Sequence, residues 1–376
     1  MKKALIVAAP GGFAIRFEQN NMEILRSMGY EIHYAADFNN RVYEFQDEFW
    51  TDRNIAVHQV DFVKNPFDIR GNLRAYGQLK KLAAHGDFSI VHCHTPVAAA
   101  IARLVFRKKT SAKVIYTAHG FHFYKGAPLS SVIYKLVEKA LARYTDVLIT
   151  INSEDFLQAK RFAYREGGYA QYIPGVGINL EKFVRTTQVA KKMPGDIFNI
   201  VSVGELNDNK NHINVIRAIA MIGDKRIRYD IYGNGPLREK LEQTIQLYKL
   251  ESQVRLCGYC NDTCRVLNDT DCFVFPSIRE GLGMAAVEAL ACGVPVIALN
   301  QRGAREFLQD GKNGYFCDNT PADFARTIKK VMALSQSDLE KFSGCAVASS
   351  KKFDEKNTIR IMKKIYNHID SELQGV

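Results

Sequence analysis

The chain has 376 residues, of which 47% are hydrophobic and 24% charged, and its formal net charge is +11. This length predicts two domains that each bury a core, and the composition is ordinary for a soluble globular protein. No run approaches the 18 apolar residues of a membrane-spanning helix, so that class is not expected.

The chain begins with two lysines and the apolar run 4–9, which together resemble the start of a secretory signal. The run is too short for a signal, and Pro10-Gly11-Gly12 follows it as a turn. We therefore expect the first strand of a domain here.

Positive charge is concentrated in residues 1–150, which hold 20 Lys and Arg against 13 Asp and Glu, whereas the remainder holds 31 against 27. This excess of positive charge can simply form a solvated face. Alternatively, it can indicate contact with an anionic acceptor or with a membrane surface. No nucleic-acid partner is expected, because no recognition motif accompanies the charge.

Eight cysteines are present, several of them in predicted strands or helices. We expect reduced thiols in a cytoplasmic protein. Cys257, Cys260 and Cys264 resemble zinc ligands, but a structural zinc needs four ligands and no second pair lies nearby. We expect no metal.

Strand-like and helix-like stretches alternate through the first half. Apolar strands with helical crossovers predict a parallel, doubly wound sheet. The expected strands are 4–9, 31–36, 55–60, 89–94, 113–118, 146–151 and 171–173, and the expected helices are 14–28, 71–84, 97–106 and 130–143.

The pattern pauses from about 174 to 195, which predicts a linker, and then resumes. The sequence thus predicts two Rossmann-like α/β domains facing a cleft, with boundaries at 1–182 and 183–352 and a last helix at 353–376. In the second half the expected strands are 198–203, 229–232, 254–257, 272–275, 295–299 and 314–316, and the expected helices are 212–222, 236–248, 262–267, 284–292, 304–308 and further helices after 320.

Two acids carry the most information about function. Glu280 lies in a glycine-rich loop that follows a buried strand, and Glu288 lies about one turn into the helix that begins near Met284. The N-terminus of a helix favours anions, and carboxylates beside it suit hydroxyl groups. A ligand with phosphates and many hydroxyls, such as a nucleotide sugar, fits both features.

Four other loops follow predicted strands. Lys210 could place an ammonium on a phosphate, and the turn at Gly233-Asn234 could let a ligand approach the backbone. Gly12 could bring N–H groups to a phosphate. His119 leaves its strand directly and is the better functional candidate of its run, whereas His92 and His94 are expected to be satisfied polar groups.

Asp269-Thr270-Asp271 spells a triplet that binds metal-nucleotides in other transferases. Here it precedes its strand, which puts it at the amino end of the sheet. We expect an ordinary strand-entry loop.

Together these motifs resemble the retaining glycosyltransferases of family 4, with the two-domain GT-B architecture, and most closely those of bacterial capsule and exopolysaccharide synthesis. The resemblance covers essentially the whole chain. It depends on Glu280 and Glu288 within Pro-Ser-x-x-Glu-Gly-Leu-Gly, on Gly-Val-Pro-Val-Ile at 293–297, on Thr-Ala-His-Gly-Phe-His at 117–122, on Val203-Gly204 with Lys210, and on Gly233-Asn234-Gly235-Pro236.

The resemblance implies transfer of a hexose or N-acetylhexosamine from a nucleoside diphosphate sugar, with UDP the expected nucleotide, retention at the anomeric carbon and no metal cofactor. It implies catalytic roles for His119, Lys210 and Glu280, and a ribose contact for Glu288. The C-terminal helix would pack back on the first domain. The implied donor-binding set is Gly12, Gly204, Glu205, Lys210, Gly233, Asn234, Arg279, Glu280, Gly281, Leu282, Gly283, Met284 and Glu288.

One position departs from the family pattern, because Glu205 stands where an arginine is common. Arg279 could supply the missing cation. The implied acceptor is a saccharide or a polyprenyl-linked saccharide, and the implied place is the cytoplasm, peripheral to the inner face of the plasma membrane.

Three alternatives stay open: a non-catalytic nucleotide-sugar-binding partner in a polysaccharide assembly complex, a GT-B sugar-nucleotide epimerase, and a glycoside hydrolase that uses Glu280 and Glu288 as an acid–base pair.

Overall fold

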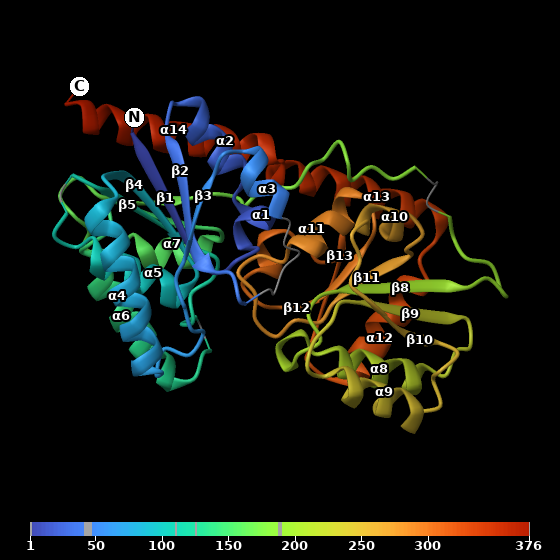
Figure 1. The fold of residues 1–376 in the computed structure, drawn as a ribbon. Helices are drawn as coiled ribbons and strands as arrows, with labels where there is room; N and C mark the ends of the chain where they lie inside the picture. Colours follow the sequence, from blue (N-terminus) through green and yellow to red (C-terminus); the bar gives the residue numbers. More distant parts are fainter. Residues whose placement is uncertain (1, 41–46, 110, 125, 187–189, 376) are drawn as a thin grey trace. The chain divides into compact units, whose positions relative to one another are not determined.

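The computed structural model describes the chain except for residues 1, 41–46, 110, 125, 187–189 and 376. It divides into two compact units (Figure 1). Unit 1 comprises Met1–Val176 together with Lys356–Val376, and unit 2 comprises Gly177–Glu355.

Unit 1 is built on a seven-stranded parallel sheet in the order β3-β2-β1-β4-β5-β6-β7. The strand order reverses between β1 and β4, and at such a point an open α/β sheet leaves a crevice outside its carboxyl edge. The strands are β1 (Lys3–Pro10), β2 (Glu31–Asp37), β3 (Ala56–Gln59), β4 (Phe88–His94), β5 (Lys113–Ala118), β6 (Val147–Thr150) and β7 (Tyr169–Tyr172).

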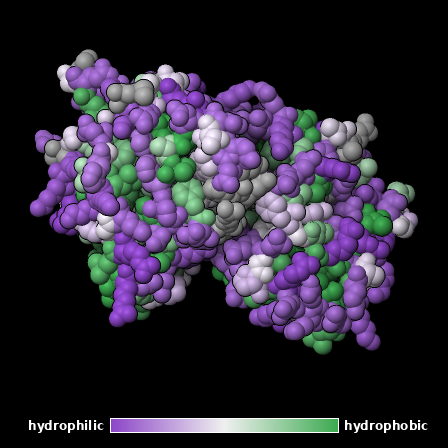
Figure 2. All heavy atoms as spheres, viewed as in Figure 1, coloured by the Kyte–Doolittle hydropathy of each residue, from purple (hydrophilic) through white to green (hydrophobic). Residues whose placement is uncertain are grey.

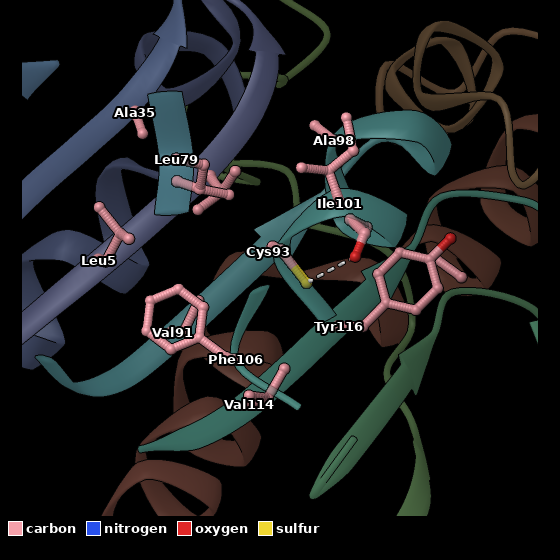
Figure 3. Close-up of a cluster of buried hydrophobic side chains, with 14 of the residues drawn as sticks. Leu5, Ala35, Leu79, Val91, Cys93, Ala98, Ile101, Phe106, Val114 and Tyr116 are labelled. Carbon is pink, nitrogen blue, oxygen red and sulfur yellow. Dashed lines mark hydrogen bonds between the residues drawn. The ribbon is translucent and has the colours of Figure 1, made fainter. Parts of the chain in front are cut away.

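Helices cover both faces of this sheet, so its central strands β1, β4 and β5 are buried almost throughout. Figure 3 shows Leu5, Val91 and Val114, from β1, β4 and β5, gathered with Phe106 and Ile101 on one face. The helices are α1 (Phe13–Phe17), α2 (Gln19–Ser27), α3 (Asp47–Asp52), α4 (Ile69–His85), α5 (Pro96–Val105), the 3₁₀ turn η1 (Leu129–Ser131), α6 (Val132–Ala142), α7 (Ser153–Ala159) and α14 (Glu355–Gln374).

The helix predicted over 14–28 is wrong as one element, because it is two helices that meet at Glu18. Glu18 has φ −119° and ψ 5°, and its side chain is only 1% exposed. The apolar periodicity continues across the break, so the pattern could not reveal it. The sequence also did not predict α3 and α7, which are six and seven residues long.

The last helix belongs to unit 1, as the resemblance implied, since residues from Lys356 onward join it. Tyr366 of α14 contacts His92 of β4, with its hydroxyl 2.8 Å from Nδ1. Asp370 accepts hydrogen bonds from Lys2 and from the Tyr30 hydroxyl, each at 2.5 Å.

Unit 2 is built on a six-stranded parallel sheet in the order β10-β9-β8-β11-β12-β13. Its strand order reverses between β8 and β11, so the loops after these two strands lie at the same edge. The strands are β8 (Phe198–Val203), β9 (Ile227–Tyr232), β10 (Val254–Gly258), β11 (Cys272–Phe275), β12 (Val296–Leu299) and β13 (Gly314–Cys317).

The predicted helix over 304–308 is a single 3₁₀ turn in the structure, η3 (Ala304–Glu306). The two-domain α/β fold class is confirmed by the two sheets. The other helices of unit 2 are η2 (Asp208–Lys210), α8 (His212–Ile222), α9 (Arg238–Leu247), α10 (Thr263–Asn268), α11 (Met284–Ala291), α12 (Pro321–Met332), α13 (Gln336–Ser350) and η4 (Lys351–Phe353).

Among the described residues, no helix is both long enough and apolar enough to span a bilayer.

Candidate active site

Lys210 sits on a short loop whose shape comes from asparagines. Asn207 caps the turn η2 by accepting from the backbone N–H of Lys210 at 3.0 Å. Asn211 follows in the left-handed region, with φ 54°, a conformation that asparagine tolerates better than most residues. The chain can therefore turn directly from η2 into α8 just after Lys210.

The same loop is tied to the loop that follows β11. The amide of Asn209 donates to the carbonyl of Arg279 at 2.9 Å and accepts from the backbone N–H of Arg279 at 3.1 Å. Asn211 Nδ2 donates to the carbonyl of Pro276 at 3.2 Å. These cross-links fix the spacing of the two loops, and the sequence pattern did not single out either asparagine.

Lys210 and Glu280 meet at the centre of this arrangement, with Nζ 2.5 Å from Oε1. Each side chain is 21% exposed, so water screens this pair less than a surface pair. The lysine stem lies over Gly204, where an added Cβ would be 3.0 Å from Cε, and the ammonium is 5.6 Å from the ring centre of Phe275. The cation is thus held in place before any ligand binds.

The loop carrying Glu280 leads into the N-terminus of α11. Gly283 occupies the N-cap with φ 111°, and an added Cβ would lie 2.4 Å from the ring of Phe275. The first turn, from Met284, contains no acid. A helix N-terminus and its dipole favour an anion, such as a phosphate, beside Gly281 and Leu282.

Glu288 lies one turn into α11 and is buried. The hydroxyl of Thr263, at the start of α10, donates to Glu288 Oε2 at 3.2 Å. A carboxylate that already accepts from a hydroxyl is suited to holding a ligand hydroxyl as well.

Arg302 is a buried cation that the sequence pattern did not single out. It follows β12, and its Nε donates to the carbonyl of Glu280 at 3.2 Å.

Arg279, the expected substitute for the family arginine, has a half-exposed side chain. Glu205 is exposed and accepts from Asn207 Nδ2 at 3.0 Å.

Gly233 and Gly235 have a reason within the fold to be glycine. An added Cβ on Gly233 would lie 1.9 Å from the carbonyl oxygen of Gly204, and one on Gly235 would lie 2.5 Å from that of Leu206. Asn234 is exposed, and its carbonyl accepts from the N–H of Leu206 at 3.0 Å. The backbone of Gly204 and Leu206 makes the close approach that requires glycine at these two positions.

In unit 1, His119 follows β5 and is enclosed by aromatic rings. The ring of Phe13 packs edge-on at 5.3 Å between centroids, and that of Phe17 lies at 6.2 Å. This burial lowers the pKa of His119 to about 4, so the ring is neutral at physiological pH. The next loop is fixed by Asp155, whose Oδ2 accepts from the N–H of Phe121 at 2.9 Å.

His119 is the outer member of a chain of buried groups. Its Nε2 lies 3.3 Å from Nδ1 of His94, and Nε2 of His94 lies 3.3 Å from Oε2 of Glu18. The second contact is poorly aligned, so among the described residues His94 Nε2 has no well-formed hydrogen bond. The expectation of a satisfied polar group is therefore wrong for His94.

Glu18 is unusual because burial raises the pKa of its carboxyl to about 8, while an Asn21 hydrogen bond at 2.7 Å opposes that rise. Burial also lowers the pKa of His94 well below its ordinary value. At neutral pH Glu18 is therefore a carboxylic acid, and His94 and His119 are neutral imidazoles. Glu18 could not be singled out from the sequence, since a lone acid within a helical pattern gives no signal.

Gly12 lies at the N-cap of α1 and is buried. Thr95, directly after His94, has φ 59°, an uncommon value for a β-branched residue. Its hydroxyl accepts from the N–H of Ala9 at 3.0 Å, which ties the ends of β1 and β4 together. Such strain is typical of functional sites.

Glu18, His92 and His94 form the one cluster of potential metal ligands among the described residues. His92 does not fit that role, because Nδ1 contacts the Tyr366 hydroxyl and Nε2 the Thr117 hydroxyl, each at 2.8 Å. His92 is thus the satisfied polar group that was predicted.

Asp271 likewise serves the fold, since its carboxylate accepts from the N–H of Asn199 at the start of β8, at 2.8 Å.

Comparison with known proteins assigns both units. Residues 4–152 match the family model described as glycosyl transferase 4-like, and residues 185–343 match glycosyl transferases group 1. EpsD of Bacillus subtilis (strain 168), named as a glycosyltransferase, is 34% identical over 97% of this chain and 96% of its own. The chain belongs to the group 1, family-4-like glycosyltransferases.

A second relative of this glycosyltransferase is 28% identical over 67% of the chain and 68% of its own length. It is the UDP-Gal:alpha-D-GlcNAc-diphosphoundecaprenol alpha-1,3-galactosyltransferase of Escherichia coli. Gly12 and His119 fall within the first matched region, and Lys210, Glu280 and Glu288 within the second.

Solved structures share the fold. Sucrose-phosphate synthase of Thermosynechococcus elongatus superposes with a TM-score of 0.80 at 17% identity, covering 99% of this chain and 100% of that one. Anabaena HepE in complex with UDP and glucose gives 0.74 at 18% identity, with 99% and 100% covered. At these identities the likeness shows the GT-B fold of the glycosyltransferase and no more.

Proposed function

We propose that this glycosyltransferase moves a hexose or N-acetylhexosamine from a UDP-sugar, with retention, to a saccharide or polyprenyl-linked saccharide in cell-surface polysaccharide synthesis. The observation that carries the proposal is the pairing of Lys210 with Glu280 beside the N-terminus of α11. The ammonium of Lys210 and the carboxylate of Glu280, which can accept from a sugar hydroxyl, therefore lie beside the N-terminus of α11, which favours anions.

The chemistry needs stabilisation of a leaving diphosphate. The bond between the anomeric carbon and the diphosphate oxygen breaks, and its electron pair stays on that oxygen. Lys210 and the α11 N-terminus offer positive potential that is already in position, which is the arrangement that most lowers such a barrier. The acceptor oxygen bonds to the same face of the anomeric carbon, and its proton leaves with the diphosphate.

The other residues position the donor. Glu288 would hold the ribose hydroxyls, and Glu280 with the backbone from Gly281 to Met284 would hold the sugar and diphosphate. His119 would lie beside the reacting sugar, and Gly12 would offer backbone N–H groups to the diphosphate. This proposal requires no metal cofactor.

The acceptor is supported by the relatives. The Escherichia coli relative is named for a diphosphoundecaprenol acceptor, and so is a Campylobacter jejuni relative that is 34% identical over 31% of this chain. The positive charge concentrated in residues 1–150 is suited to the anionic cytoplasmic face of a membrane. We therefore place the enzyme at that face as a peripheral protein.

The first experiment screens UDP- and GDP-sugars for thermal stabilisation and then measures nucleotide release with and without an acceptor. We expect a UDP-sugar to stabilise the protein and UDP to appear only with the acceptor. Turnover without an acceptor would favour an epimerase or hydrolase, and binding without transfer would favour a non-catalytic partner.

Lys210→Ala tests the role of the cation in the same assay. We expect turnover to fall by about a hundredfold or more, because the departing diphosphate loses its charge partner. Lys240→Ala, which removes an exposed lysine from α9, is the control and should leave turnover unchanged. Near-normal turnover in Lys210→Ala would refute the proposed mechanism.

A further inference from the structure

Unit 1 contains an apolar groove that none of the roles above uses. Its volume is about 570 Å³, which is the size of a small-molecule site. The floor is α5, with Val97, Ala100, Ile101 and Leu104. One wall comes from the segment before and into α4, including Val63 and Phe67, and the other from α6, including Ile133 and Val137.

Most side chains that line the groove are apolar, and its uncharged polar members are Asn72, Thr95, Tyr116, His122 and Tyr134. Its one acid, Glu138, is already engaged, because Arg103 Nη1 donates to it at 2.8 Å and the Tyr116 hydroxyl lies 3.4 Å away. Its one lysine, Lys64, is exposed at the rim. Burial of hydrocarbon is therefore the main source of binding energy that this groove can supply.

Large apolar side chains continue from the rim onto the surface. Phe67 and Leu73 on the α4 side are 69% and 65% exposed, and Leu129 and Leu136 on the α6 side are 90% and 60% exposed. Figure 2 shows hydrophobic side chains gathered over the lower part of unit 1, where Figure 1 places α4 and α6. Apolar patches of this kind mark contacts with a lipid or a partner.

The charges on the two helices favour a lipid. α4 carries Arg70, Arg74, Lys80 and Lys81 and has no acid along its 17 residues. α6 carries Lys135 and Lys139, and its one acid is the buried Glu138. Helices with exposed apolar residues among basic ones lie at anionic membrane surfaces.

The inner end of the groove reaches the catalytic edge of the sheet. Pro10 ends β1, Thr95 follows β4 and Gly120 follows His119, and all three line the groove. A chain lying in the groove would thus have one end beside His119 and the other at the basic, apolar surface.

We propose that this groove takes up the isoprenoid chain of the lipid-linked acceptor. The inference rests on the acceptor proposed above and adds where its hydrocarbon lies. The diphosphate and saccharide would lie at the inner end beside His119, and the basic residues of α4 and α6 would face the anionic headgroups of the membrane around the outer end of the chain.

The test measures binding of farnesyl diphosphate, geranyl diphosphate and inorganic diphosphate to the full-length protein, each in competition with a fluorescent prenyl probe. We expect farnesyl diphosphate to bind at least about tenfold more tightly than geranyl diphosphate, because each added methylene buried contributes further affinity. Inorganic diphosphate should compete least. Equal affinity for all three would overturn the inference.

Ala100→Trp supplies the matched variant, since it fills the floor of the groove without changing charge. We expect it to abolish the dependence on chain length, while thermal stabilisation by UDP, measured in parallel, stays as in the wild type. Leu247→Glu on α9, a 76% exposed position in unit 2, is the control and should alter neither.

The two readouts separate this inference from the proposed function. Normal UDP stabilisation without prenyl preference would overturn the groove and leave the transferase intact. A preference for the longer prenyl chain without any UDP-sugar binding would support the groove and contradict the proposed transferase function. Prenyl preference that survives Ala100→Trp unchanged would place the hydrocarbon elsewhere and overturn the inference.

Discussion

Among single residues, Glu18 sets which way hydrogen bonds point behind His119. The Glu18 carboxyl lies 3.3 Å from Nε2 of His94, and a rotation that aligns this contact would let a protonated Glu18 donate to it. Nδ1 of His94 would then donate to Nε2 of His119, so that His119 presents Nδ1–H outward. An ionised Glu18 reverses both bonds and makes Nδ1 of His119 an acceptor. Tyr366, His92 and Asn21 lie near this carboxyl, and Asn20, Thr117 and Thr358 line the same small cavity. Glu18 is thus a positioning residue that acts through His94.

The pH profile of transfer tests that role. Because the Glu18 pKa is raised to about 8, we expect turnover to fall as pH rises through that value. In Glu18→Gln we expect that decline to disappear, since an amide does not ionise. The glutamine N–H can still donate to His94, and the Asn21 amide can turn so that its oxygen accepts from the glutamine. Glu23→Gln, an exposed acid on α2, is the control and should keep the wild-type decline. A Glu18→Gln profile that falls like the wild type would contradict the role.

Stability provides an independent check on the same carboxyl. The folded pKa of about 8 lies above the ordinary 4.5, so the unfolded chain releases this proton first as pH rises. The folded state therefore loses stability between about pH 4.5 and 8. We expect Glu18→Gln to be more stable than the wild type by a margin that grows across this window, measured by urea unfolding at several pH values. A margin that stays constant with pH would contradict the raised pKa.

At the scale of elements, the start of α11 depends on Gly283. An alanine there must adopt φ 111° and place its Cβ 2.4 Å from the Phe275 ring, which also lies beneath Lys210. We expect Gly283→Ala to destabilise unit 2 by roughly 1–3 kcal/mol and to weaken UDP binding. Thermal unfolding with and without UDP measures both effects.

Gly344 in α13 is the matched control for that substitution, because an added Cβ meets nothing within 4 Å. Gly344→Ala should stabilise the protein by about 0.5–1 kcal/mol, since alanine is the better helix former. If Gly283→Ala behaved like Gly344→Ala, the constraint at α11 would be refuted.

The order of the elements could be predicted because apolar strands buried on both faces have a strong pattern. β8, α8 and β11 have the predicted bounds, whereas α3 and α7 are too short for a helical period to appear. Lys210 and Glu280 could be assigned to one edge of the sheet because parallel strands present their carboxyl ends together. Their contact could not be predicted, since it depends on Asn209 and Asn211, which cross-link two loops far apart in the sequence.

At the scale of the whole molecule, the chain finishes its first unit with its last helix. The His92–Tyr366 contact joins residues 274 positions apart, and α14 buries Met362, Ile365 and Ile369 against unit 1. His92 also contacts Thr117, and its ring packs 4.2 Å from that of His94. The tail therefore supports the histidines behind His119 as well as the core.

Removing residues 356–376 tests this dependence. We expect unit 1 to lose much of its stability, because His92 loses the partner of its Nδ1 and the apolar surface beneath α14 becomes exposed. Unit 2 should keep its own core. Hydrogen–deuterium exchange measures the two separately, and we expect protection to fall in β4 and β5 but not in β8 and β11.

Tyr366→Phe is the milder companion, since it removes one hydroxyl and keeps the packing. We expect it to destabilise unit 1 by about 1–3 kcal/mol, the usual cost of leaving a buried polar group unpaired. UDP should still stabilise unit 2 in both variants, because the residues expected to hold the nucleotide lie within 177–355. Equal loss of protection in both sheets would show that α14 stabilises the molecule as one cooperative body and would refute its assignment to unit 1.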